Sequence, residues 1–215
     1  MMAAVPGHFV VLEGGEGIGK STQVARLAAR LSERGVDVVT TFEPGATERG
    51  AALRQLLLHD GAPLDPRAEL LLMAADRAAH VREVVRPALA AGKVVVCDRF
   101  APSTLTYQGV GRGLGVEAVE AVSAFATDGL QPDLVIVLDV DDAVAARRRP
   151  VAEDRMERAG AEFHARVRAA YRELAARYGW VVVDGAGAVD AVADAVWAVV
   201  EPVVAAGELG SRDSR

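Results

Sequence analysis

The segment from Gly14 to Ser21 reads Gly-Gly-Glu-Gly-Ile-Gly-Lys-Ser and matches the phosphate-binding pattern G-x-x-x-x-G-K-[ST]. An apolar run at 8–13 precedes it and an amphipathic segment at 20–34 follows it, so the motif lies between a predicted strand and a predicted helix. In such a loop the backbone N–H groups and the positive end of the following helix surround phosphate oxygens. The motif therefore predicts a nucleoside triphosphate site in an α/β chain.

Individual positions of this loop carry expected roles. Lys20 can reach the β- and γ-phosphates, and the Ser21 hydroxyl can bind Mg²⁺. The lysine is informative because the chain has 24 Lys and Arg residues together, and only Lys20 and Lys93 are lysines. We expect the triphosphate to contact Gly14, Gly15, Gly17, Ile18, Gly19, Lys20, Ser21 and Thr22.

Apolar, strand-like runs alternate with helical stretches along the rest of the chain. We expect strands at 8–13, 37–42, 93–98, 133–139 and 180–184. We expect helices at 20–34, 48–58, 66–91, 115–128, 142–148, 154–178 and 188–206. Strands that are apolar throughout are typical of a parallel sheet with helices on both faces, where ligands bind outside the carboxyl ends of the strands. The prediction is a three-layer α/β fold of the P-loop NTPase type with five parallel strands, as one domain over 1–206 and a disordered tail at 207–215.

Composition and charge limit the possible partners. The net charge of −6 argues against a surface that binds nucleic acid, although it does not exclude a small anionic ligand. The single cysteine, Cys97, lies in an apolar run, so we expect a buried thiol and a reducing compartment. Charged residues and Pro202 interrupt the apolar stretch at 189–207, which argues against a membrane span. We therefore expect a cytoplasmic protein.

Two predicted strands end in an aspartate, and either could serve as the acidic partner of the phosphate loop. Asp98 ends the run at 94–98, and Asp139 ends the run at 134–139. Such a residue can act on Mg²⁺ or on its bound water. It can also simply cap the next helix, which is the interpretation we favour for Asp139.

Polar side chains gather after other strand ends. The segment 98–113 is dense in hydrogen-bonding groups and glycine, which favours a ligand site over a plain turn. Glu43 precedes Pro44 and Gly45 in a predicted tight turn, where it could be a ligand group or a solvated turn residue.

Two groups of arginines need partners. Arg77 lies in an apolar helical stretch and must find a ligand or an ion-pair partner, for which adjacent Asp76 is one candidate. The basic cluster at 147–149 and 155–158 could be a solvated face. Because the cluster follows a strand in a phosphate-loop chain, we favour a mobile lid whose arginines neutralise a transferring phosphoryl group.

Taken together, these segments resemble the thymidylate kinase (dTMP kinase) family of nucleoside monophosphate kinases, over about residues 8 to 205. The resemblance implies a five-stranded parallel sheet, a homodimer, Mg²⁺-ATP as phosphoryl donor and dTMP as acceptor, with dTDP as the product. It rests on the phosphate loop with Glu16, Glu43-Pro44-Gly45, Ala75-Asp76-Arg77, Asp98-Arg99-Phe100, the stretch from Ser103 to Gly113, Leu138-Asp139-Val140 and Asp154-Arg155-Met156-Glu157.

The resemblance also implies roles residue by residue. Arg99 and Glu16 would surround the acceptor phosphate and sugar, and Arg77 would hydrogen-bond the pyrimidine. The implied acceptor-binding residues are Glu43, Pro44, Met73, Arg77, Arg99, Ser103, Thr104, Tyr107 and Gln108. Ser21 and Asp98 would be the metal residues.

A lid at about 147–155 is part of the same resemblance and would bring Arg147, Arg149 and Arg155 to the phosphates. Ile18 stands where some relatives carry a basic residue, so the catalytic arginine should come from the lid. The implied catalytic residues are Lys20, Arg99, Arg149, Arg155 and Glu16.

Four positions depart from the family pattern, namely Phe42, Ala46, Met73 and Ala79. Phe42 replaces an expected phosphate-pairing arginine, and Met73 replaces an aromatic residue expected to stack on thymine. Unless Arg49 or Arg54 supplies the missing charge, the sequence predicts weak binding of dTMP.

Other functions are compatible with these departures. One is a divergent kinase for another or a modified pyrimidine nucleoside monophosphate, and another is a nucleotide-binding protein without turnover. A GTPase switch is disfavoured, because the chain has no asparagine for the guanine-reading N-K-x-D motif.

Overall fold

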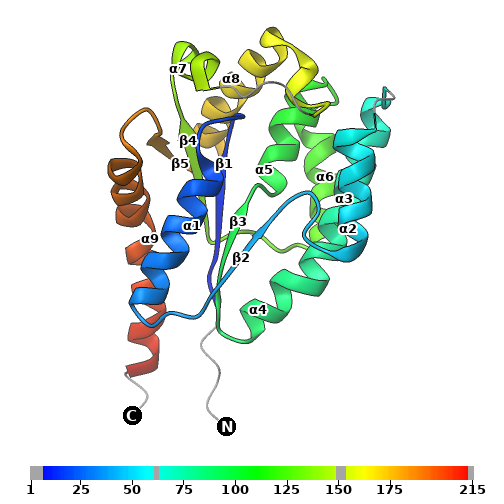
Figure 1. The fold of residues 1–215 in the computed structure, drawn as a ribbon. Helices are drawn as coiled ribbons and strands as arrows, with labels where there is room; N and C mark the ends of the chain where they lie inside the picture. Colours follow the sequence, from blue (N-terminus) through cyan, green and yellow to red (C-terminus); the bar gives the residue numbers. More distant parts are fainter. Residues whose placement is uncertain (1–6, 61–62, 149–153, 213–215) are drawn as a thin grey trace.

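A five-stranded, all-parallel sheet forms the centre of the molecule, in a computed structural model that describes residues 7–60, 63–148 and 154–212 (Figure 1). The strand order is β2-β3-β1-β4-β5. The strands are β1 (Phe9–Gly14), β2 (Val38–Phe42), β3 (Val94–Asp98), β4 (Leu134–Asp139) and β5 (Val181–Asp184). All five expected strands are present, and their ends lie within one residue of the predicted ones, which confirms the α/β fold of the P-loop kinase type.

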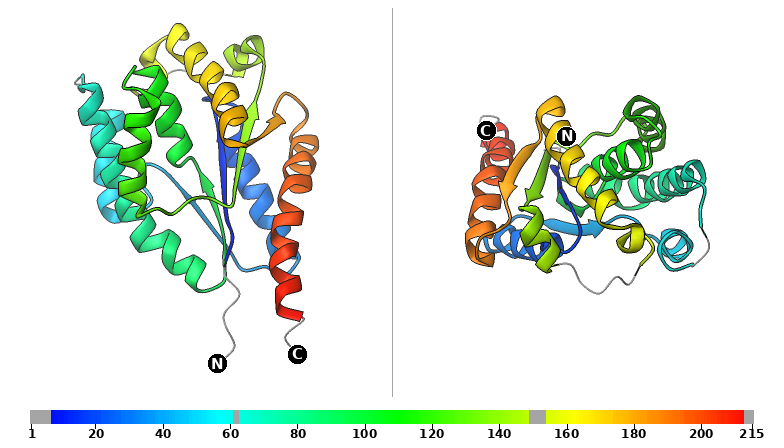
Figure 2. Two further views of the ribbon diagram at one scale, coloured as in Figure 1. Left: turned by 180° about the vertical axis from the view of Figure 1, so that it is seen from behind. Right: turned by 90° about the horizontal axis from the view of Figure 1, so that it is seen from above.

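Helices cover both faces of the sheet, as Figure 2 shows from behind and from above. They are α1 (Lys20–Glu33), α2 (Glu48–Arg54), α3 (Pro66–His80), α4 (Arg86–Ala90), α5 (Ala101–Thr104), α6 (Val116–Thr127), α7 (Asp142–Arg148), α8 (Ala161–Tyr178) and α9 (Val189–Arg212). Short π-helical and 3₁₀ turns extend or join them: η1 (Gln55–His59), η2 (Val81–Val85), η3 (Leu105–Gly111) and η4 (Glu157–Ala159).

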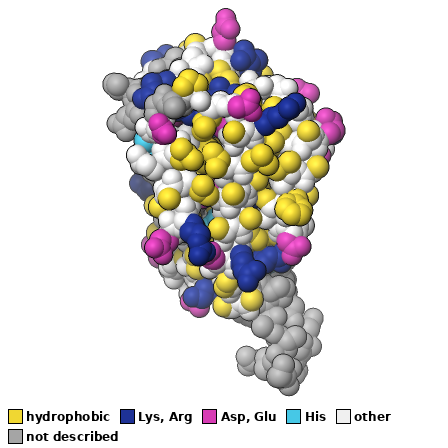
Figure 3. Space-filling view, turned by 90° about the vertical axis from the view of Figure 1, so that its right-hand side faces the viewer, with side chains coloured by type: hydrophobic (Ala, Val, Ile, Leu, Met, Phe, Trp, Pro, Cys, Tyr) yellow, Lys and Arg dark blue, Asp and Glu magenta, His cyan; other side chains and the backbone are white. Residues whose placement is uncertain are grey.

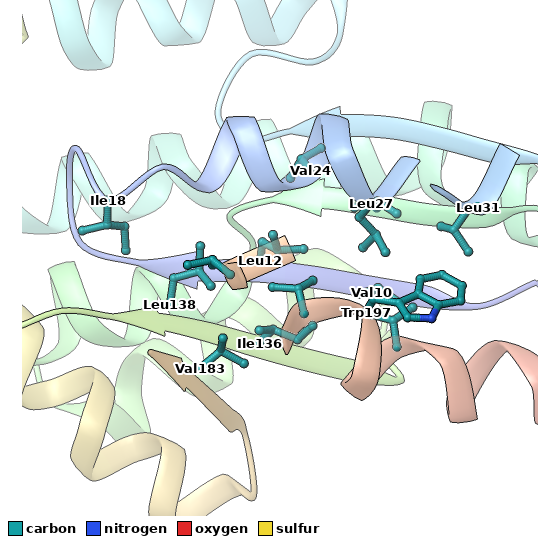
Figure 4. Close-up of a cluster of buried hydrophobic side chains, with 14 of the residues drawn as sticks. Val10, Leu12, Ile18, Val24, Leu27, Leu31, Ile136, Leu138, Val183 and Trp197 are labelled. Carbon is teal, nitrogen blue, oxygen red and sulfur yellow. The ribbon is translucent and has the colours of Figure 1, made fainter. Parts of the chain in front are cut away.

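Alternate residues of the buried strands supply the two cores. Val10 and Leu12 of β1 point to the face covered by α1 and α9, where they meet Leu27, Leu31 and Trp197 (Figure 4). The neighbouring residues of β1 point to the opposite face, in a cluster with side chains of β3, η2 and α4. Because each strand is apolar on both faces, burial accounts for the unbroken apolar runs of the sequence.

Strand register fixes where the site lies. Leu12 of β1 and Phe42 of β2 both pair with Asp98 of β3. The segments that leave these three strands are the phosphate loop, the turn at Glu43 and the segment that begins at Arg99, and they emerge at one edge of the sheet. This is the edge at which open parallel sheets bind ligands.

Two helical expectations are wrong. The segment 154–178 is not one helix, because Gly160 has φ 93°, a backbone conformation that ends η4 before α8 begins. The polar segment that follows Asp98, where no helix was expected, is helical over α5 and η3. The carboxylate of Glu13 accepts the N–H groups of Phe100 and Ser103 at 2.8 and 3.2 Å, and so caps this helix from another strand.

The end of the chain also differs from expectation. Helix α9 runs to Arg212, so residues 207–212, expected to belong to a disordered tail, continue the helix. Extension of an existing helix needs no new nucleation, which offsets the weak helix propensity of its glycines. No helix in the described ranges is long and apolar enough to cross a membrane. Cys97 is fully buried, as expected, and burial raises the pKa of its thiol well above the ordinary value.

Candidate active site

The phosphate loop has the backbone shape that its glycines allow. Gly14 and Gly19 have φ values of 130° and 94°, which other residues rarely adopt. A Cβ atom on Gly14 would lie 2.3 Å from the carbonyl oxygen of Leu138. No side chain caps the N-terminus of α1, so its first N–H groups are available to an anionic ligand.

Lys20 is buried inside this loop. Its Nζ donates to the carbonyl oxygens of Gly15 at 2.5 Å and Gly14 at 3.3 Å. Burial, followed by the charge of Arg99, lowers the pKa of Lys20 to about 8. A phosphate in the loop would stabilise the charged ammonium group.

Ser21 and Asp98 lie together at the mouth of the loop, where the Ser21 hydroxyl donates to Asp98 Oδ2 at 2.7 Å. Hydroxyl and carboxylate oxygens are ligands that suit Mg²⁺, which takes its remaining ligands from water and substrate phosphates. The described residues include no group of three or more acidic, histidine or cysteine side chains that could hold a metal by themselves. Asp139 instead accepts from Arg172 Nε at 2.7 Å, so Asp98 is the acid beside the loop.

Arg99 connects the loop with the segment after β3. Its Nη1 donates to the carbonyl of Gly14 at 3.0 Å and its Nη2 to Glu16 Oε1 at 2.7 Å. Burial by itself raises the pKa of Glu16, but the charges of Arg99 and Lys20 outweigh this effect and lower it to about 2. Tyr107 also donates to Glu16, at 2.8 Å. The resemblance implies that Glu16 and Arg99 surround the same acceptor phosphate and sugar, and in the structure these two residues form an ion pair.

Glu13 anchors this arrangement from the end of β1. It is fully buried and accepts from the Ser103 hydroxyl at 2.6 Å and the Tyr171 hydroxyl at 2.8 Å. Burial raises its pKa, although the charge of Arg99 partly offsets the effect. Sequence reasoning missed Glu13 and Tyr171. The available signal was an acidic residue at the end of an otherwise apolar strand.

Arg77 of α3 is buried in a polar network. Its Nε donates to Glu43 Oε2 at 2.9 Å and its Nη2 to Thr104 Oγ1 at 2.8 Å. The other oxygen of Glu43 lies 2.8 Å from His80 Nδ1. Glu43 is thus a buried partner of Arg77, not a solvated turn residue, whereas Asp76 Oδ1 accepts from the Gly45 N–H at 3.1 Å. Arg77 Nη1 is buried without a partner in the described structure.

The residues expected to bind an acceptor meet in one pocket. Its lining includes every one of them: Glu43, Pro44, Met73, Arg77, Arg99, Ser103, Thr104, Tyr107 and Gln108. The lining also includes Glu16, Arg54, Leu58, Phe100, Asp154 and Met156, of which sequence reasoning gave an individual role only to Glu16 and Arg54.

A second pocket adjoins the first. It is lined by loop residues 16–22, by the end of β2 and by Asp98, and it shares Glu16, Glu43, Arg54, Arg99 and Asp154 with the first pocket. Gly14 and Gly15 are not in its lining, and their carbonyls accept from Lys20 and Arg99. Two ligands could therefore meet at Glu16 and Arg99.

The expected lid arginines lie in different places. Arg147 is exposed on α7, and Arg149 lies outside the described residues. Arg155 donates to Glu69 Oε2 at 2.7 Å and to the carbonyl oxygen of Leu57 at 2.9 Å. Arg155 is absent from the described linings of both pockets, so its Nε and Nη1 are engaged outside them, while its Nη2 is buried without a hydrogen-bond partner among the described residues.

The departure at Phe42 has a structural counterpart in Arg54. The guanidinium carbon of Arg54 lies 5.6 Å from the centre of the Phe42 ring, and its Nη1 donates to the carbonyl of Pro44 at 2.7 Å. Arg54 lines both pockets, whereas the Arg49 side chain is 85% exposed and lies 3.6 Å from Glu83. Of the two arginines considered as substitutes for the charge missing at Phe42, Arg54 is therefore the one that lies in the pockets.

The sequence is also similar to those of known proteins. The family described as thymidylate kinase matches residues 12–196. A thymidylate kinase from Synechococcus sp. (strain JA-3-3Ab) is 51% identical over 196 residues, which cover 90% of this chain and 95% of the relative. One from Solidesulfovibrio magneticus is 50% identical over 204 residues, covering 89% and 98%. One from Clavibacter michiganensis is 45% identical over 206 residues, covering 94% and 98%.

The pKa of Lys20 leads to a prediction about pH. The protonated side chain binds phosphate, so kcat/KM for the triphosphate should be constant well below pH 8, reach half of that value near pH 8 and keep falling as pH rises further. The Lys20→Arg variant is the control, because arginine stays charged and should lose this decline even if its activity is lower. A decline of equal size and midpoint in both proteins would show that another group titrates.

Proposed function

The chain belongs to the thymidylate kinase family, and we propose that its two adjoining pockets hold the ATP and the dTMP that its reaction joins. The chain phosphorylates dTMP to dTDP with ATP as the donor. The observation that carries the proposal is the continuity of the two pockets. All the expected acceptor residues line one pocket, which meets the phosphate loop at Glu16 and Arg99.

The donor binds at the loop. The N–H groups at the start of α1 and the Lys20 ammonium group hold the β- and γ-phosphates, and Lys20 exchanges its loop carbonyl partners for phosphate oxygens. Ser21 and Asp98 hold Mg²⁺, directly or through water. When bound, Mg²⁺ neutralises charge on the phosphate oxygens during transfer.

The acceptor binds in the pocket between α3 and η3. The unpartnered Nη1 of Arg77 donates to an oxygen on the base edge, since Glu43 and Thr104 already fix the rest of the guanidinium group. Gln108 and Met73 line the base region. Arg99 and Arg54 hold the monophosphate at the boundary with the donor pocket, and Glu16 faces the sugar.

The residues of the chain act mainly by positioning two anions in line and offsetting their repulsion. Arg54 and Arg99 place fixed positive charge at the boundary between the two pockets, and Lys20 places it in the loop pocket. The transferring group then needs one further cation from the lid. Arg149 is the first candidate for this role, because Arg155 is bound to Glu69.

A coupled ADP-release assay tests the assignment of the acceptor. With Mg²⁺-ATP, we expect kcat/KM for dTMP to exceed that for dUMP, dCMP, dAMP and dGMP. Lys20→Ala should abolish turnover while the protein stays folded, because its charge is needed most in the transition state. Preference for another monophosphate, or near-normal turnover by Lys20→Ala, would contradict the proposal.

Arg54 and Arg49 offer a matched pair of variants for the phosphate assignment. A charge-assisted hydrogen bond to phosphate is worth about 1.5–3 kcal/mol, so Arg54→Ala should raise KM for dTMP roughly tenfold or more. Arg49→Ala removes a neighbouring arginine that is exposed and should change KM less than about twofold. Equal effects of the two substitutions would contradict a specific role for Arg54.

We also propose a homodimer that works in the cytoplasm. The side of the molecule formed by α2, α3 and α6 carries a broad band of hydrophobic side chains (Figure 3). Its exposed apolar residues include Ala52, Leu56, Leu71, Ala75, Ala118, Ala121 and Phe125. Phe125 is 90% exposed, and an apolar face of this kind is typical of a surface that a second copy covers. The single buried cysteine suits a reducing compartment.

Phe125→Glu tests the dimer. A carboxylate at this position would have to be buried against the second copy, so we expect the variant to be monomeric at concentrations at which the unchanged protein is a dimer. Sedimentation measures the mass. Val182→Glu, which replaces another exposed apolar residue on β5, should leave the dimer intact. A monomeric unchanged protein, or a dimeric Phe125→Glu variant, would contradict the proposed interface.

A further inference from the structure

Glu69 is a buried carboxylate that the reaction described above does not use. It lies in the first turn of α3 and is fully buried. Gln108 Nε2 donates to its Oε1 at 2.7 Å, and Arg155 Nη1 donates to its Oε2 at 2.7 Å. Arg112 donates to both oxygens, through Nε and Nη2 at 3.2 Å each. These donors come from 39, 86 and 43 residues away in the chain, respectively.

The donors belong to two functional parts of the molecule. Gln108 lines the acceptor pocket. Arg155 belongs to the described segment 154–159, and its backbone N–H donates to the carbonyl of Leu58, another pocket residue, at 2.9 Å. Next to it, Met156 lines the same pocket, and its sulfur lies 3.6 Å from Arg112 Nη2. The segment 154–159 and the acceptor pocket are therefore held by one carboxylate.

The contacts among Gln108, Arg112 and Arg155 depend on the negative charge of Glu69. Two arginines share the one carboxylate, which has no solvent to replace either contact. Burial favours protonation, but the hydrogen bonds from Gln108 and Arg112 and the charge of Arg112 lower the pKa of Glu69 below its ordinary value. A charged carboxylate can hold its donors in one geometry, whereas a neutral amide would offer one oxygen and a competing NH₂ group.

We propose that Glu69 is a positioning residue that couples acceptor binding in the pocket to the placement of the segment 154–159, in which Asp154 lines both pockets and Glu157 lines the donor pocket. A shift of Gln108 on an acceptor base moves Oε1 of the carboxylate, and Arg155 is bound to the other oxygen of the same group. Loss of Glu69 frees both contacts at once. The inference rests on the proposed acceptor role of this pocket, and it adds a residue that touches neither substrate.

A double-mutant cycle tests the coupling. Glu69→Gln and Arg155→Met are compared singly and together, in kcat and in KM for dTMP at saturating Mg²⁺-ATP. Misplacement of a segment that lines the pockets, with its side chains unchanged, can cost about 10- to 100-fold in kcat. We expect each single variant to lower kcat by about tenfold or more, and the double variant to fall no more than about twofold further. Arg155→Lys, which keeps a positive charge beside Glu69 Oε2, should recover part of the loss.

A second experiment measures hydrogen exchange in the protein without nucleotide. In this state the backbone N–H of Arg155 donates to the carbonyl oxygen of Leu58. Hydrogen exchange at the amides of 155–159 should be about tenfold faster in Glu69→Gln than in the unchanged protein. The control is Asp194→Asn, which breaks the Arg30–Asp194 ion pair at 2.6 Å, outside both pockets. This control should change neither exchange at 155–159 nor kcat.

Two results would overturn the coupling. One is a double variant whose loss in kcat equals the product of the single losses, which would mean that Glu69 and Arg155 act independently. The other is unchanged exchange at 155–159 in Glu69→Gln. Failure of the proposed function is distinguishable, because it would show in the unchanged protein as lack of turnover with dTMP.

Discussion

The ion pair between Arg99 and Glu16 is the interaction on which the rest of the site depends. Parallel pairing of β1 with β3 sets Leu12 opposite Asp98, so the chain leaves β3 directly beside the phosphate loop. Arg99 then takes a positive φ of 70°, which is uncommon for a residue with a side chain, and its guanidinium group reaches Glu16 at 2.7 Å. The loop and the acceptor pocket share this pair as a common wall. A change in either residue should therefore affect both ligands.

Buried carboxylates keep the arginines of the site in place. Glu43 binds Arg77, Glu16 binds Arg99 and Glu69 binds Arg155. Each pair fixes one side of a guanidinium group, and at Arg77 this leaves a buried donor free for a ligand. The molecule carries a net charge of −6, yet the pockets for two anions are lined by cations held in advance. Such preorganisation lowers the reorganisation needed when charge develops during transfer.

Much of this arrangement could be predicted from the sequence because it follows from local patterns. Continuous apolar runs located the strands, and the phosphate-loop motif located the donor site. Strand ends such as Phe42 and Asp98 then brought Glu43 and Arg99 to one edge. The choice of Asp98 over Asp139 needed the structure, since both end a strand and only the register and the Ser21 contact distinguish them.

Contacts between distant segments could not be predicted in the same way. Nothing local indicates that Glu69 meets Arg155, 86 residues away, or that Glu13 caps the helix after β3. The helical form of 101–111 was missed because its polar residues satisfy partners in the core, so a polar pattern that is typical of a loop was misleading. The proximity of Arg54 to Phe42 depends on a turn that brings two positions 12 residues apart to one pocket.

Comparing acceptors in two arginine variants tests the central claim, that Arg99 serves both ligands through their shared boundary while Arg77 serves the base alone. The measurement is kcat/KM for dTMP, dUMP and dCMP in Arg99→Lys and in Arg77→Met. Lysine keeps the charge at position 99 but loses the two-pronged contact, so its loss should be the same factor for every acceptor. The Arg77 variant should instead change the order of the acceptors. A loss that is uniform in both variants, or an order that changes with Arg99, would contradict the account.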